Sequence, residues 1–229
     1  MNQSAYQDIV FDIETVGVPW EELPESVRQN LIRKAGDGGE DQARSMLGLS
    51  PATGKIVAIA YFDVQRGKGR VFYESNDPSA AEESEHFVPG NERFLLEKFY
   101  EIIGQYRRYI TYNGKYFDVP FLLARSAVHR IVPRPYPVTR RFSLFPHLDL
   151  CELMSSFGAV RFATLDAWCH TFGVKSPKDG IDGSQVQGVY ESGGIRDIAS
   201  YCLEDVRATA ELFERTEPFL LAPRDDAHR

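Results

Sequence analysis

Two carboxylates interrupt an otherwise apolar strand near the start of the sequence. The stretch VFDIETVG, Val10 to Gly17, reads as a buried β-strand, yet it carries Asp12 and Glu14 two positions apart. Successive strand residues point to opposite faces, so both carboxylates leave the strand on the same face. Burying two like charges side by side is costly unless a cation or a cluster of donors compensates them, and such groups are usually paired or ligate metal.

Further functional groups lie far along the chain at positions where they could join this pair. Asp118 begins a helix that follows YITYNG, while Tyr201 and Asp205 lie four positions apart on the last helix, hence on one of its faces. Each feature is weak alone, because D-x-E arises by chance in a chain with 33 acidic residues and Tyr/Asp pairs are common on helix surfaces. Together they predict a convergence of four carboxylates and one phenol.

Other familiar chemistries lack their motifs. The sequence has no G-x-S-x-G, and Gly54-Lys55 fails the phosphate-loop pattern because Leu49 and Ile56 occupy positions that require Gly and Ser or Thr. The segment KDGIDG superficially resembles a calcium loop, but the twelfth position is Tyr190 rather than a bidentate Glu. We interpret that segment as a turn.

Taken in chain order, three segments resemble the motifs of the DnaQ-like (DEDD) 3′→5′ exonucleases. FDIET (11–15), NGKYFD (113–118) and YCLED (201–205) look like its D-x-E, N-x-x-x-F-D and Y-x-x-x-D motifs. The third resembles the tyrosine variant, since Ser200 stands where the histidine variant has His. Within the superfamily, the closest similarity is to the proofreading exonuclease domain of family B DNA polymerases and its predicted stand-alone relatives. HLDL (147–150), TLD (164–166) and the GIDGSQV loop also look like that group, and the resemblance runs from about Asp8 to Phe213.

The resemblance implies an RNase H-like α/β fold, with a mixed central sheet flanked by helices, and a role for each motif residue. The metal ligands would be Asp12, Glu14, Asp118 and Asp205. Carboxylate oxygens suit Mg²⁺ or Mn²⁺, and two such ions ~3.5–4 Å apart can activate an attacking water and stabilise the leaving oxygen. Tyr201, with a reference pKa of ~10, is a poor base at neutral pH and is expected to orient the water. The product would be a nucleoside 5′-monophosphate.

Four more motif residues are expected near the nucleic acid. Thr15 and Asn113 occupy positions expected beside the terminal nucleotide. Phe117 either packs under the site or belongs to the core, and burial statistics for Phe favour the core. Lys115 either reaches a phosphate or is a solvated side chain. Asp149 and Asp166 are expected to stabilise helix starts, and His147 to be structural rather than catalytic.

A local excess of positive charge contrasts with the acidic chain. Net charge is −7 with a pI of about 5.3, which argues against a broad basic face that coats duplex DNA. Between Val119 and Leu148, however, there is no Asp or Glu, and the segment holds Arg125, Arg130, Arg134, Arg140 and Arg141. These arginines either surround a helix end in solvent or form a groove wall that guides phosphates. An acidic exonuclease needs to hold only a few nucleotides of a single-stranded 3′ end.

The elements that must position these residues can be outlined from periodicity. Strand patterns at 8–14, 55–64 and 69–75 predict a meander, and 109–113 predicts a further strand followed by a turn at Gly114. Helical patterns are expected at 21–35, from Asn91 to about Tyr106, at 117–131 with Pro120 in the first turn, at 163–174 ending at Gly173, and from Ile195 to about Phe213. Ser184 to Gln187 has the form of a capping box. Strand alternating with helix implies a parallel element in the sheet.

Composition indicates a globular cytoplasmic protein with one domain. The domain is expected to span residues 1–222, with a polar helical excursion at 18–54 and a flexible tail at 223–229. The three cysteines, Cys151, Cys169 and Cys202, form no C-x-x-C pair, so we expect reduced core residues. No run approaches the ~18 apolar residues that span a bilayer, and MNQSAYQD does not resemble a targeting signal, so no membrane partner is expected.

The sequence thus predicts a two-metal 3′→5′ exonuclease on single-stranded nucleic acid, with DNA expected. No polymerase segment follows in this sequence, so we expect action alone, or in repair or proofreading with a polymerase or repair protein in trans. Two alternatives remain: an exoribonuclease with the same chemistry, and a non-catalytic nucleic-acid-binding or scaffold domain. The intact carboxylate set argues against the scaffold.

Overall fold

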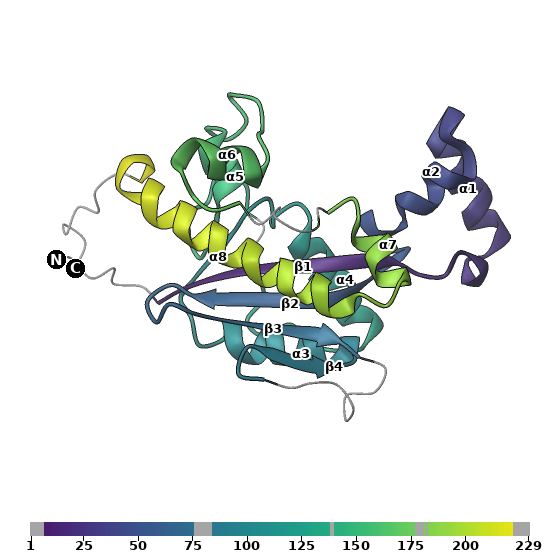
Figure 1. Ribbon diagram of the computed structural model, residues 1–229, viewed down its shortest axis with the longest axis horizontal. Coiled ribbons are helices and arrows are strands. Elements are labelled where there is room, and N and C mark those ends of the chain that lie inside the picture. The colour runs from purple at the N-terminus through teal and green to yellow at the C-terminus, as the bar shows by residue number, and fades with distance from the viewer. Residues whose placement is uncertain (1–6, 76–83, 138–139, 177–180, 182, 222–229) are drawn as a thin grey trace.

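A six-stranded mixed sheet forms the centre of the molecule (Figure 1). The computed structural model describes residues 7–75, 84–137, 140–176, 181 and 183–221. In the order β4-β3-β2-β1-β5-β6, the strands are β4 (Phe87–Gly90), β3 (Lys68–Glu74), β2 (Gly54–Asp63), β1 (Asp8–Gly17), β5 (Arg108–Thr111) and β6 (His147–Asp149). The pairs β1–β2 and β2–β3 are antiparallel, and β3–β4, β1–β5 and β5–β6 are parallel. The predicted meander and the predicted parallel element are both confirmed.

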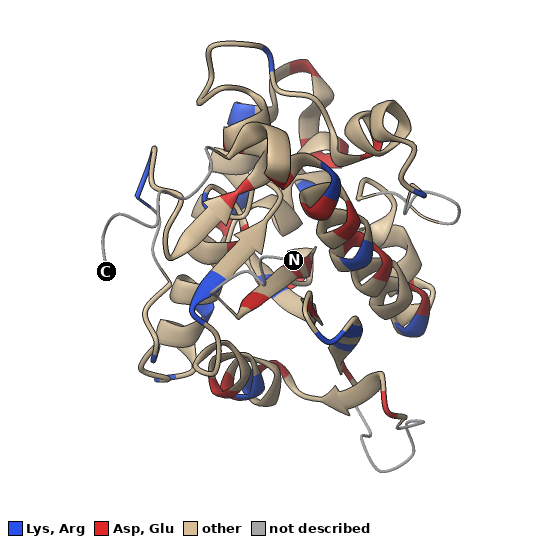
Figure 2. Ribbon diagram, turned by 90° about the vertical axis from the view of Figure 1, so that its left-hand side faces the viewer, with Lys and Arg blue, Asp and Glu red and all other residues tan. Residues whose placement is uncertain are grey.

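Helices cover both faces of this sheet. They are α1 (Glu25–Ala35), α2 (Gly39–Ser45), α3 (Glu92–Ile103), α4 (Asp118–Val128), α5 (Leu150–Met154), α6 (Leu165–Phe172), α7 (Val186–Glu191) and α8 (Ile195–Leu220). Side chains of α3 and α4 pack with one face in a single apolar cluster, and α8 packs on the other face (Figure 1). On the side of the molecule drawn in Figure 2, acidic and basic residues are interspersed along α8, and two ion pairs link successive turns of this helix, Arg207–Glu204 and Arg215–Glu211.

The central strand β1 alternates strictly between the two cores. Ile9, Phe11 and Ile13 pack in the cluster with α3 and α4, and Val10 and Val16 in the cluster with α8. This period of two follows from the pleat of the strand. Asp12 and Glu14 therefore occupy the α8 side, where the apolar pattern would otherwise continue.

A buried ion pair fixes the register of β1 against β5. Arg108 donates from Nε and Nη2 to the two carboxylate oxygens of Asp8, each at 2.7 Å, and these two residues are also register partners in the sheet. A bidentate pair of this geometry is directional as well as strong. The parallel pairing of β1 and β5 sets where the chain leaves β5 relative to the middle of β1.

The chain leaves the sheet after β1 and returns to it at Gly54, the first residue of β2, and we refer to residues 18–54 as the excursion. This excursion contains α1, α2 and the 3₁₀ turns η1 (Trp20–Glu22), η2 (Gly36–Gly38) and η3 (Leu47–Leu49). It projects beyond one end of the sheet (Figure 1) and has a small apolar cluster of its own, formed by Trp20, Leu23, Ala43 and Leu47. It is tied to β1 where the hydroxyl of Thr15 donates to the carbonyl of Gly48 at 2.6 Å.

Several predicted helix ends are confirmed. Asn91 caps α3 by accepting from Phe94 N, Asp149 caps α5 by accepting from Glu152 N, and Gly173 ends α6 in the left-handed conformation with φ 65°. Pro120 occupies the first turn of α4, as expected. Asp166 lies in the first turn of α6, while Thr164 is its N-cap.

Other boundaries were predicted wrongly. The capping box at Ser184 does not form, because the side chain of Gln187 accepts from Gly17 N and donates to Glu191 instead. Helix α8 continues past Phe213 to Leu220, with Pro218 in its last turns. The short strands β4 and β6 and the helices α2 and α5 were not predicted. Most of the expected KDGIDG turn and the tail at 223–229 lie outside the described residues.

All three cysteines are buried and free, in agreement with the prediction. Among the helices in the described ranges, none is long and apolar enough to cross a membrane.

Candidate active site

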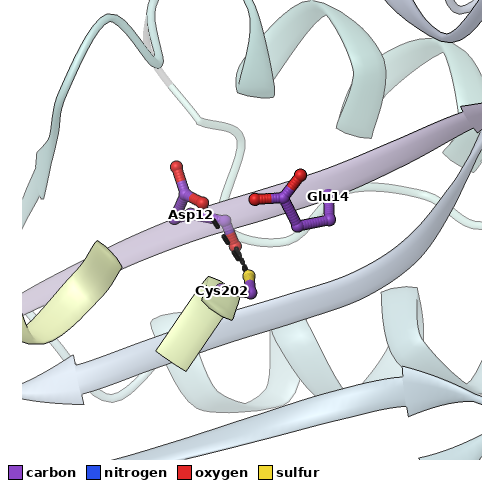
Figure 3. Close-up of side chains that lie close together, drawn as sticks. All are labelled: Asp12, Glu14 and Cys202. Carbon is purple, nitrogen blue, oxygen red and sulfur yellow. Dashed lines mark hydrogen bonds between the residues drawn. The ribbon is translucent and has the colours of Figure 1, made fainter. Parts of the chain in front are cut away.

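The side chains of Asp12 and Glu14 leave β1 toward α8 (Figure 3). Both residues are partly buried. The register between β1 and β2 shifts between Glu14 and Thr15, because β2 has an extra residue, Val57, opposite this point of the strand that carries the acids. Bulges re-aim side chains and are frequent beside active sites.

Asp118 lies beside β1 because α4 begins shortly after β5, the strand next to β1. The chain leaves β5 at Thr111, turns through 112–117 and enters α4 at Asp118. Its Oδ1 accepts a hydrogen bond from Ile13 N at 3.1 Å, so the carboxylate lies against the backbone between Asp12 and Glu14. Asp118 is only 3% exposed. A contact between residues 105 positions apart thus depends on the parallel pairing of β1 and β5.

Helix α8 brings the third motif onto the same face of the sheet. Tyr201 and Asp205 lie one helical turn apart and so share a face of α8. Between them, the thiol of Cys202 lies 3.6 Å from the carbonyl oxygen and 3.8 Å from Oδ2 of Asp12. Ligand atoms of Asp12, Glu14 and Cys202 all lie within 4.8 Å of one another (Figure 3).

A cleft opens over this cluster. All four predicted carboxylates, together with Thr15, Asn113 and Phe117, contribute to its lining. The excursion supplies a further part of the wall through Ser45, Gly48, Leu49. The segment that leads into α7 supplies another part through Gly183, Ser184, Val186, Gln187. Strand, turn, excursion and helix therefore meet around one opening.

The electrostatics of the cluster are those of crowded, buried acids. Burial, followed by the charges of Asp118, Asp205 and Glu14, raises the pKa of Asp12 well above its ordinary value. Burial and then the charges of Asp205 and Asp118 also raise the pKa of Glu14. Burial, together with the charges of Asp149 and Asp205, raises the pKa of Asp118 to about 8. Backbone hydrogen bonds to this carboxylate act in the opposite direction and lower its pKa. Each carboxylate therefore destabilises the charge on its neighbours.

Tyr201 is held in its protonated form. Burial and then the charges of Asp205, Glu14 and Asp12 raise the pKa of its phenol above the ordinary value. A protonated phenol can donate a hydrogen bond but cannot remove a proton from water at neutral pH. This is consistent with an orienting role and not with a general base.

The donor set fits a hard divalent cation. Carboxylate oxygens are preferred by Mg²⁺ and Mn²⁺, and a cation among these acids would offset the repulsion that raises their pKa values. Zinc sites usually combine His and Cys ligands, and one buried thiol does not supply such a set. The residues thus fit the metal class that the sequence predicted.

The residues expected to contact nucleic acid differ in their surroundings. Thr15 lines the cleft, but its hydroxyl is engaged by Gly48 O. Asn113 is exposed at the cleft with a left-handed backbone, φ 64°, and its N–H donates to Asp149 Oδ1. Phe117 is half-buried: it lines the cleft and also stacks on Phe121 at 5.2 Å between centroids, so it belongs to both the site and the core.

Lys115 is not a solvated side chain and is not free to approach a phosphate. It is 3% exposed, and its Nζ donates to Glu152 Oε2 and to Ser143 O, both at 2.7 Å. The backbone N–H of Lys115 also donates to Asp149. Within the described structure it is a buried ion-pair partner that joins the 112–117 turn to α5.

The arginine-rich segment is divided between structural and exposed positions. Arg125 forms a bidentate pair with Glu92 of α3, which also binds His129, so neither belongs to a groove wall. The ring of His147 is buried and hydrogen-bonds with Thr111, which agrees with the structural role predicted for it. Arg130, Arg134, Arg140 and Arg141 are exposed.

Sequence reasoning missed several residues at the site. Cys202 was correctly expected to be buried, but its contact with Asp12 depends on how α8 crosses β1. Gln187 lines the cleft and binds Gly17 N, and the S-x-x-Q pattern pointed to a different role. The position of Leu49 at the cleft could not be predicted, because a single leucine in a polar segment belongs to no motif.

Comparisons with known proteins identify the family of this chain. Residues 50–220 match the model of a protein family described as "Predicted 3'-5' exonuclease related to the exonuclease domain of PolB". The matched segment contains Asp118, Tyr201 and Asp205, whereas Asp12 and Glu14 precede it.

Two archaeal DNA polymerases are similar in sequence. The DNA polymerase of Methanocaldococcus jannaschii is 32% identical over 82 residues, which cover 36% of this chain and 5% of the polymerase. The DNA polymerase of Thermococcus litoralis is 25% identical over 177 residues, which cover 69% of this chain and 10% of the polymerase. The chain thus spans about a tenth or less of the length of these relatives.

A solved structure shows the same fold. The family B DNA polymerase from Pyrobaculum calidifontis superimposes with a TM-score of 0.63 at 19% identity, over 94% of this chain and 25% of the polymerase. The mixed sheet flanked by helices is therefore the expected RNase H-like α/β fold. Because the family model also matches more than half of the chain, this protein belongs to the family of predicted 3′–5′ exonucleases related to the exonuclease domain of PolB.

Proposed function

We propose that this protein is a metal-dependent 3′→5′ exonuclease that releases nucleoside 5′-monophosphates from single-stranded 3′ ends. The observation that carries the proposal is the convergence of Asp12, Glu14, Asp118 and Asp205 in one cleft, with the phenol of Tyr201 close enough to be affected by three of these charges. These residues come from a strand, a helix start and the middle of a distant helix. Such a convergence is difficult to explain as a way to stabilise the fold, since buried like charges oppose folding.

The four carboxylates would hold two Mg²⁺ or Mn²⁺ ions. When bound, such a pair activates a water for attack on the phosphodiester and stabilises charge on the leaving oxygen. The protein's own contribution is to fix the ligands: the N–H of Ile13 holds Asp118, and the irregularity at Val57 of the neighbouring strand β2 lies directly opposite Glu14 and Thr15. Positioning of this kind is a large part of catalysis at metal sites.

Tyr201 would orient the attacking water. Its hydroxyl stays protonated beside Asp205, so it can donate one hydrogen bond and accept another without changing charge. Asn113 and Phe117 would contact the terminal nucleotide from the turn on one side of the cleft, and Thr15 would hold the opposite wall by its bond to Gly48. Lys115 has no place in this set because of its buried pair with Glu152.

DNA is the substrate we favour, because the relatives similar in sequence are DNA polymerases. We propose that the protein acts on 3′ ends during repair, or proofreads for a polymerase in trans. RNA is the alternative with the same chemistry, and the 2′-OH is the group by which a protein distinguishes the two. The cytoplasmic location and the one-domain organisation stay predictions.

A single degradation assay tests the proposal. A 5′-labelled single-stranded oligonucleotide, DNA or RNA, is incubated with Mg²⁺ or Mn²⁺ and the wild-type protein, Asp12→Ala, or Asp41→Ala as a matched control at an exposed aspartate of α2. We expect a ladder that shortens from the 3′ end with the wild type and with Asp41→Ala, and none with Asp12→Ala. Intact oligonucleotides in every lane would contradict the function and favour the scaffold alternative.

A further inference from the structure

Two exposed aromatic rings lie on two segments that are bonded to the same carboxylate, and one of these segments lines the cleft. Tyr116 is 52% exposed and belongs to the same turn as Asn113 and Phe117, which line the cleft. Phe142 is 61% exposed and lies in the loop before β6. Large aromatic rings are normally buried, so two exposed rings joined to one site require an explanation.

One buried carboxylate connects these two segments. Oε1 of Glu152 accepts from the hydroxyl of Tyr116 and from Phe142 N, each at 3.2 Å. Oε2 of the same residue accepts from Lys115 Nζ, which also donates to Ser143 O. The turn and the loop are thus fastened to each other through Glu152, and the positions of both rings are set before any ligand binds.

The backbone around the second ring is held in an unusual conformation. Phe142 has φ 64° and its stacking partner Phe157 has φ 58°, in the left-handed region that non-glycine residues rarely adopt. Their ring centroids are 5.6 Å apart. Conformations of this kind cost free energy, persist where surrounding contacts enforce them, and cluster at binding sites.

The charge around the rings is positive. In the segment 140–161 the exposed charged residues are Arg140, Arg141 and Arg161, while its two acids, Asp149 and Glu152, are 1% and 3% exposed. The guanidinium of Arg141 lies 4.9 Å from the centroid of Phe142. Aromatic faces combined with arginines form the surface that binds single-stranded nucleic acid without sequence preference, by stacking bases and attracting phosphates.

We propose that Tyr116, Phe142 and Arg141 form a platform that holds the nucleotides directly 5′ of the one being cleaved. The proposal rests on the exonuclease function, because the cleft then takes the terminal nucleotide and the platform takes the strand that enters it. The occupant is a single strand: a duplex presents its bases stacked on each other, whereas unpaired bases can stack on protein rings.

Binding measurements test the platform separately from hydrolysis. All variants are made in the Asp12→Ala background, and their affinities for labelled (dT)2 and (dT)8 are measured by fluorescence anisotropy with Mg²⁺. The dinucleotide can fill little more than the cleft, so the gain in affinity from (dT)2 to (dT)8 reports the platform. We expect Phe142→Ala and Tyr116→Ala to weaken binding of (dT)8 at least about fivefold, and binding of (dT)2 less than about twofold.

Two variants separate stacking from structural damage. Tyr116→Phe keeps the ring and loses its own bond to Glu152, but Lys115 still fastens the turn to Glu152, so this variant should bind (dT)8 like the background. Phe219→Ala removes a ring that is 84% exposed, 14 residues beyond Asp205 on α8 and so about 20 Å along the helix from it, and should also bind normally.

The platform is overturned if (dT)8 binds no better than (dT)2 in the background, or if Phe142→Ala and Tyr116→Ala leave the affinity for (dT)8 unchanged. Equal losses for both lengths would also overturn it, because they would indicate a damaged cleft. Failure of the exonuclease function has a different signature, namely normal length-dependent binding with no degradation by the wild-type protein.

Discussion

At the scale of single residues, the site consists of carboxylates that the fold alone would not favour. Burial and mutual repulsion raise the pKa values of Asp12, Glu14 and Asp118. A protein retains such a cluster only if something in its function requires it. Tyr201 shares this environment, and the three nearest carboxylates keep its phenol protonated.

Tyr201→Phe tests the orienting role of this phenol. We expect the turnover number to fall about 10- to 100-fold, since one hydrogen bond to the reacting water is lost, while Mg²⁺ or Mn²⁺ binding persists because all four carboxylates remain. Turnover is measured by single-nucleotide release, and metal binding by calorimetry. Tyr136→Phe, at a tyrosine that is 62% exposed, is the control. Loss of metal affinity in Tyr201→Phe would show that the phenol helps to form the metal site instead.

The sequence identified the motif residues but not all of their neighbours. Because alternate residues of a pleated strand point to the same side, the D-x-E spacing alone predicted that Asp12 and Glu14 share a face. The proximity of Cys202 to Asp12 depends on the crossing of α8 over β1, which no local pattern encodes. The surroundings of Lys115 were predicted wrongly because its partner Glu152 lies 37 positions away, on a helix that the sequence did not indicate.

At the scale of elements, most strands and helices with a clear periodicity were predicted, whereas the short elements β4, β6, α2 and α5 were not. Strand β1 alternates over ten residues, whereas β6 has three and β4 has four and contains Pro89. Pairing of such short strands comes from the edge that a neighbour offers, not from their own pattern. The excursion contributes Ser45, Gly48 and Leu49 to the cleft wall, and its own sequence pattern did not define that role.

One of the bonds that connect the 112–117 turn to α5 is a buried ion pair between Lys115 and Glu152, which can be removed. Lys115→Met would leave Glu152 buried without its cation, and the free energy of unfolding should fall by about 3–5 kcal/mol. Lys68→Met removes an exposed pair with Glu85 and should cost about 0–1 kcal/mol. Urea unfolding measures both variants. If Lys115→Met is as stable as Lys68→Met, the pair does not hold the turn.

At the scale of the whole molecule, the acidic cluster couples folding to pH and to divalent cations. A carboxyl whose pKa is higher in the folded state than in the unfolded chain contributes stability at low pH and loses it as the pH rises through the folded value. For Asp118 this window runs from its ordinary pKa of 3.8 to about 8. A cation bound only by the folded state acts in the opposite direction, since it stabilises the ionised cluster by mass action.

Asp118→Asn separates these two effects. An amide can still accept the hydrogen bond from Ile13 N but never ionises, so without metal the variant should become more stable relative to the wild type as the pH rises from 4 to 8, by an amount on the order of a few kcal/mol. Saturating Mg²⁺ should then stabilise the wild type more than the variant, most strongly at the upper end of this window. Urea unfolding with a chelator and with Mg²⁺ measures both differences, and Asp41→Asn is the exposed control. Parallel stability curves for Asp118→Asn and the wild type would mean that Asp118 ionises freely in the folded protein, and the crowding of charge inferred for the cleft would be wrong.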